Sequence, residues 1–76
     1  MNYLFEALCK KLEGEIAMAK ANCKAYERNV VGIGEHPDIV EAIETQIAKI
    51  AEAEDKLEAI HNHFGYGYKN SSWHRT

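Results

Sequence analysis

Apolar residues in the first part of the chain recur at alternating spacings of four and three residues. The series is Phe5, Cys9, Leu12, Ile16, Ala19, Cys23, Tyr26, Val30 and Ile33. This spacing places one side chain per turn on a single face of an α-helix, as in the heptad repeat of a coiled coil. We therefore predict a first helix over residues 3–31, with an apolar seam along one face.

The second part of the chain repeats this pattern. The series runs through Ile39, Ile43, Gln46 with Ile47, Ile50, Ala53, Leu57, Ile60 and Phe64, and predicts a second helix over residues 38–64. The intervening GIGEHPD supplies Gly32 as a left-handed helix terminus and Pro37 as a helix starter, so residues 32–37 are predicted to form a turn. Gly65 is predicted to end the second helix.

Two helices of similar length joined by a short turn favour an antiparallel hairpin. The sequence therefore predicts an all-α fold, with the hairpin in residues 1–64 and a short aromatic tail in residues 65–76. Further apolar residues flank the seams at Leu4, Leu8, Met18 and Val40, so the apolar faces are wider than one neighbouring helix would cover.

We expect a second copy to cover these faces, giving a homodimeric four-helix bundle; the alternative cover is a different protein. The residues expected to form the core of the hairpin or of the dimer are Phe5, Leu12, Ile16, Tyr26, Ile43, Ile47, Ile50, Leu57, Ile60 and Phe64. Gln46 is a polar exception. It either fixes the register from a buried position or lies at the wet edge of the seam.

The chain closes with GYGYKNSSWHRT, which is too rich in Gly and Ser to continue a helix. Aromatic residues and arginine are enriched at protein interfaces, so the tail is a candidate for partner binding. Its candidate residues are Tyr66, Tyr68, Lys69, Trp73, His74 and Arg75. Two other outcomes stay open: the tail folds back over the apolar face of its own hairpin or its dimer mate, or it is disordered.

Charge is distributed unevenly around a net charge of −3. Residues 1–31 carry five bases and four acids, whereas residues 35–58 carry eight acids and two bases. An acidic second helix opposes a polyanion, which argues against nucleic acid as the partner. The basic aromatic tail keeps nucleic-acid binding as an alternative function, because Tyr and Trp can stack on bases.

Candidate chemistry is sparse in this sequence. Cys9 and Cys23 would lie about 21 Å apart along one helix, too far for a disulfide, and two free cysteines suit a reducing cytoplasm. No leader or membrane-spanning segment is apparent, which also favours a cytoplasmic location. His61 and His63 lack the three- or four-residue spacing of metal ligands on one helix face. We expect no metal, no cofactor, no small-molecule substrate and no enzymatic activity.

These features predict a small non-catalytic protein–protein interaction module. Short chains of this profile are typical of regulatory or inhibitory accessory factors that bind a host macromolecule, including those encoded by phages or mobile elements. A structural assembly subunit is the remaining alternative.

Overall fold

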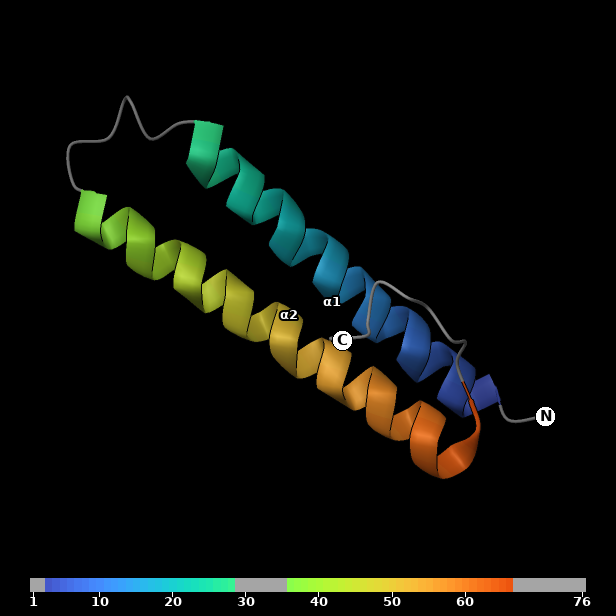
Figure 1. The fold of residues 1–76 in the computed structure, drawn as a ribbon. Coiled ribbons are helices and arrows are strands. Elements are labelled where there is room, and N and C mark those ends of the chain that lie inside the picture. The colour runs from blue at the N-terminus through green and yellow to red at the C-terminus, as the bar shows by residue number, and fades with distance from the viewer. Residues whose placement is uncertain (1–2, 29–35, 67–76) are drawn as a thin grey trace.

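The computed structural model describes residues 3–28 and 36–66, which form two α-helices (Figure 1). Helix α1 spans Tyr3–Arg28 and helix α2 spans His36–Phe64. The helices run antiparallel and pack side by side along their length, so that the end of α2 lies beside the start of α1 (Figure 1). The described part of the chain is therefore an all-helical hairpin, as the apolar spacing predicts.

The start of α2 differs from the predicted start by two residues. The helix begins at His36 rather than Asp38, because Pro37 fits the first turn of a helix, where its missing N–H is not needed. Asp38 also lies in this first turn, where a carboxylate is favoured by the helix dipole. Residues 29–35 are outside the described part, and with them Val30, Ile33 and the turn glycines Gly32 and Gly34.

The other end of α2 has a well-defined cap. Gly65 adopts a left-handed conformation with φ of 73°, and its N–H donates a hydrogen bond of 3.1 Å to the carbonyl oxygen of His61. This bond satisfies one of the carbonyls left free at a helix terminus, and glycine adopts the required backbone angle without a Cβ clash. Helix α2 consequently ends at Phe64.

The core lies between the helices at the end of the hairpin where α1 begins. Its buried cluster is Cys9, Leu12, Ala53, Leu57 and Ile60, with Phe5, Ile16 and Tyr66 packed against it. Leu12 and Leu57 are the largest fully buried side chains, each 1% exposed. Ala19, Ile39 and Gln46 extend the buried line towards the other end, so eight of the described residues are buried. A core this small leaves much of each helix's apolar face uncovered.

The predicted core residues divide into three groups in the hairpin. Leu12, Leu57 and Ile60 are buried, while Phe5, Ile16, Tyr26, Ile43 and Ile50 are partly buried. Ile47 and Phe64 are mostly exposed. On α2 the buried line runs through Gln46 and Ala53, seven residues apart, and Ile47 lies about 100° further around the helix.

The flanking apolar residues are also exposed in the hairpin, namely Leu4, Leu8, Met18 and Val40.

Candidate interaction surfaces

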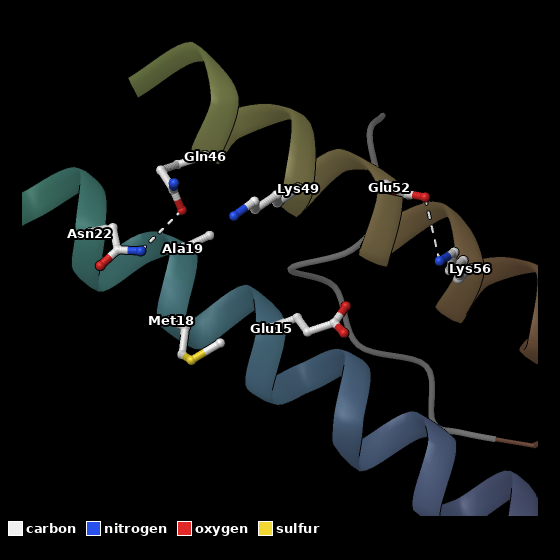
Figure 2. A pocket seen from close by; sticks show the side chains of 8 residues that line it. All are labelled: Glu15, Met18, Ala19, Asn22, Gln46, Lys49, Glu52 and Lys56. Carbon is white, nitrogen blue, oxygen red and sulfur yellow. Dashed lines mark hydrogen bonds and ion pairs between the residues drawn. The ribbon is translucent and has the colours of Figure 1, made fainter. Parts of the chain in front are cut away.

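The hairpin has two long sides, one on each flank of the buried line between the helices. The first, here called the groove side, carries a shallow groove of about 370 Å³. Its lining comes from both helices and comprises Glu15, Met18, Ala19, Asn22, Gln46, Lys49, Glu52 and Lys56 (Figure 2). Small Ala19, which is buried at the base, leaves room between the helices at this point.

A hydrogen bond crosses the groove side. Asn22 Nδ2 of α1 donates to Gln46 Oε1 of α2 over 3.1 Å (Figure 2). The Gln46 side chain is 8% exposed, whereas Asn22 is exposed. Gln46 thus occupies a buried seam position and satisfies its amide oxygen across the helix pair, which a buried polar group requires.

Charged side chains line the rest of the groove. Lys11 pairs with Glu15 one turn away, and Lys56 Nζ lies 3.4 Å from Glu52 Oε2. The hydrogen bond from Lys11 lowers the pKa of Glu15, and the charge of Lys56 on the opposite helix adds to this effect. Lys49 extends from α2 towards α1 (Figure 2).

The two lysines of α2, Lys49 and Lys56, both belong to the groove side. The remaining outer surface of α2 is acidic as a result.

The opposite flank of the hairpin carries an apolar patch, which we call the isoleucine side. It consists of Ile16, Cys23, Val40, Ile43, Ile47 and Ile50. On α1, Ile16 and Cys23 each follow a groove residue by one position, which places them about 100° around the helix.

On α2, the isoleucines lie beside the buried line on the edge away from Lys49 and Lys56. Ile47 is 53% exposed and Val40 is 64% exposed, while the other four residues are partly buried. Two large branched side chains, Val40 and Ile47, are therefore left more than half exposed on this flank.

Three aromatic rings close the end of the hairpin where α1 begins. Phe5 packs against Phe64 with a centroid distance of 4.9 Å and an interplanar angle of 35°. It also stacks on Tyr66 with a centroid distance of 4.8 Å and an interplanar angle of 5°. Such geometry is favourable beyond the area buried. Tyr66, a predicted partner-binding residue, therefore packs within its own hairpin.

The other predicted partner-binding residues lie outside the described part of the chain, namely Tyr68, Lys69, Trp73, His74 and Arg75.

Several titratable groups lie near the core. Cys9 and Cys23 are free cysteines, and burial raises the pKa of the Cys9 thiol, with further contributions from Glu13 and Glu6. Glu13 Oε2 and His61 Nδ1 are buried without a hydrogen-bond partner. Within residues 3–28 and 36–66, no three His, Cys, Asp or Glu side chains are grouped so as to hold a metal ion.

Neither described helix combines the length and the apolar character needed to cross a membrane. Comparison of the chain with protein-family models, with curated proteins and with solved structures gives no match.

Proposed function

We propose that this chain is a non-catalytic interaction module whose hairpin pairs with a second copy to form a four-helix bundle. The observation that supports the proposal is the isoleucine side, on which Ile47 and Val40 are more than half exposed. Contiguous exposed apolar surface on a small protein is typical of an interaction site. Residues 3–28 and 36–66 supply no third element to cover this flank, whereas pairing two hairpins encloses a core between four helices.

Self-association is tested with two neighbouring carboxylate substitutions on α2. Ile47→Glu places a charge on the isoleucine side, whereas Ala48→Glu places the same charge one position further around the helix, at another exposed site. We expect the wild-type chain and Ala48→Glu to sediment as dimers. Ile47→Glu is expected to sediment as a helical monomer, because Ile47 contributes little to the hairpin's own core.

A wild-type chain that stays monomeric at high micromolar concentration contradicts the proposed pairing. Equal dimerisation of Ile47→Glu and the wild type assigns the contact to another surface.

We further propose that the bundle acts on another protein as a regulatory or inhibitory accessory factor. The acidic outer surface of α2 supports a protein partner over nucleic acid, since α2 carries seven acids and two lysines, and both lysines belong to the groove side. Surface charge of one sign steers a partner of the opposite sign and repels a polyanion.

The test compares proteins recovered from the source cell by the full chain and by a chain ending at Tyr66, which keeps the ring stack on Phe5. A partner recovered only by the full chain assigns its binding to the tail. Recovery by both assigns binding to the helices, and recovery by neither contradicts the accessory role. Binding of single-stranded nucleic acid that weakens steeply with salt would support the alternative function.

A further inference from the structure

A stripe of charged residues on α1 borders the isoleucine side. The stripe follows helical spacing of four and three residues through Glu6, Lys10, Glu13, Ala17, Lys20, Lys24 and Glu27. Glu13 and Lys20 stand next to Ile16 and Cys23 on the helix surface. A molecule that covers the isoleucine side therefore meets this stripe as well.

Within residues 3–28 and 36–66, no charge of the stripe takes part in an ion pair. Among the described residues, the two ion pairs belong to the groove side and include no member of the stripe. Glu13 is partly buried, and its Oε2 atom is shielded from water without any hydrogen-bond donor. A shielded carboxylate oxygen without a donor is costly, so a cation placed against the exposed part of the Glu13 side chain would stabilise this carboxylate.

We propose that a second copy supplies this cation, with α1 of one hairpin packed antiparallel to α1 of the other. This arrangement rests on the proposed self-association and specifies its register. Lys10 faces Glu27 of the second copy, and Glu13 faces Lys24 of the second copy. The two-fold axis repeats both pairs, so four ion pairs border the apolar contact.

The charge sequence of the stripe selects this register among the antiparallel ones. A shift of one turn in one direction sets Glu6 against Glu27 and Lys10 against Lys24. The opposite shift sets Glu13 against Glu27. Both shifts bring like charges together, which disfavours association. A parallel arrangement in register is disfavoured in the same way, because every charge then meets its own copy.

Stacking α1 on α2 of the second copy also leaves Glu13 without a cation. Across the hairpin, Phe5 lies level with Phe64 and Asn22 with Gln46. Glu13 is therefore level with Asp55 and Lys56, of which Lys56 belongs to the groove side, and Glu58 lies within one turn. A second copy that turns about an axis parallel to the helices brings Glu58 towards Glu13, which is repulsive.

The alignment of α1 with α2 within one hairpin also places the isoleucines at the centre of the antiparallel contact. The midpoint between Lys10 and Glu27 on α1 is level with Ile50 on α2. The two-fold axis consequently passes close to Ile50 of both copies, and Ile47 and Ile43 lie within two turns of it. The ion pairs of α1 thus flank the isoleucines of α2.

Charge reversal tests the register with sedimentation equilibrium of the full chain. Glu13→Lys and Lys24→Glu are each expected to raise the dimer dissociation constant by about 10-fold or more, because each reversal acts at two symmetry-related pairs. The double variant Glu13→Lys with Lys24→Glu has the wild-type net charge, and we expect it to recover the wild-type dissociation constant to within about 3-fold. Circular dichroism confirms that each variant keeps its helicity.

Glu41→Lys is the matched control, because it changes the net charge as Glu13→Lys does from an exposed position on α2. If the single reversals weaken the dimer no more than this control, or if the double variant fails to recover, the register is overturned and self-association stands. A monomeric wild type overturns both. Lys24 is exposed, so Lys24→Glu reports on the register even where Glu13→Lys disturbs folding.

Discussion

The hydrogen bond between Asn22 and Gln46 makes an asymmetric prediction about stability. Its acceptor, Gln46 Oε1, belongs to a buried side chain, whereas its donor Asn22 is exposed. Removing the exposed partner leaves a buried oxygen without a donor. Removing the buried partner leaves an exposed amide that water can satisfy. The two substitutions break the same bond but should differ in their effect on the free energy of unfolding.

The magnitudes follow from which group is left unsatisfied. Asn22→Ala should lower the free energy of unfolding by about 1–3 kcal/mol, the cost of an unpaired buried polar group. Gln46→Met keeps a straight side chain of similar length in the seam and replaces a buried amide with an apolar group. It should change stability by less than about 1 kcal/mol or increase it, because replacing a buried polar group by an apolar one of similar shape is close to neutral.

Urea denaturation followed by circular dichroism at one fixed protein concentration measures both variants and their double mutant. In the double mutant the loss caused by Asn22→Ala should largely disappear, since the buried acceptor is gone. A Gln46→Met variant less stable than Asn22→Ala would refute the reasoning, as would two single effects that simply add. Sedimentation of each variant separates a change in stability from a change in association.

The core, the helix cap and the cysteine chemistry supply three further predictions. In urea denaturation, Leu57→Ala should lower the free energy of unfolding by about 3–5 kcal/mol, and Met18→Ala at an exposed site by less than about 0.5 kcal/mol. Similar losses in the two variants would contradict the assignment of Leu57 to the core. Gly65→Ala should lower the free energy of unfolding by about 1–2 kcal/mol in the same assay, because the backbone at Gly65 is left-handed. An unchanged free energy of unfolding would show that the glycine cap does not stabilise the hairpin.

The Cys9 thiol has a raised pKa, so its alkylation rate should rise at higher pH than that of an unfolded control peptide. The folded state then holds this proton more tightly than the unfolded state. Stability should fall as pH rises above the ordinary thiol pKa of about 8.5. Coincident alkylation profiles would contradict the burial.

Helix formation and hairpin pairing follow from the sequence because the spacing of apolar residues fixes one face on each helix. The exact phase of α2 does not follow in this way. Gln46 and Ile47 both continue the three- and four-residue spacing, and hydrophobicity alone favours Ile47. In the structure Gln46 faces α1, since Asn22 stands opposite and satisfies its amide. The face that α2 turns towards α1 thus depends on a residue of the other helix. The apolar spacing within α2 alone does not contain this information.

The packing of Tyr66 does not follow from the sequence, for a related reason. A tyrosine after a terminal glycine can continue away from the helix or turn back along it. The left-handed conformation of Gly65 reverses the chain, and Phe5 at the start of α1 supplies the ring on which Tyr66 stacks. Predicting that contact requires the helix end and the antiparallel pairing together. The groove likewise arises only where small Ala19 on α1 meets α2.

The difference between the two sides of the hairpin also bears on the size of the proposed assembly. Hairpins with apolar residues on both sides would stack without limit, since each addition leaves a fresh apolar surface. Here the groove side carries Lys49, Lys56 and the Asn22–Gln46 pair around Met18, whereas the exposed branched residues Val40 and Ile47 belong to the isoleucine side. Pairing through the isoleucine side buries that side in both copies. The two charged groove sides then face the solvent. The proposed assembly is therefore closed at two chains, and the groove side stays free for other contacts.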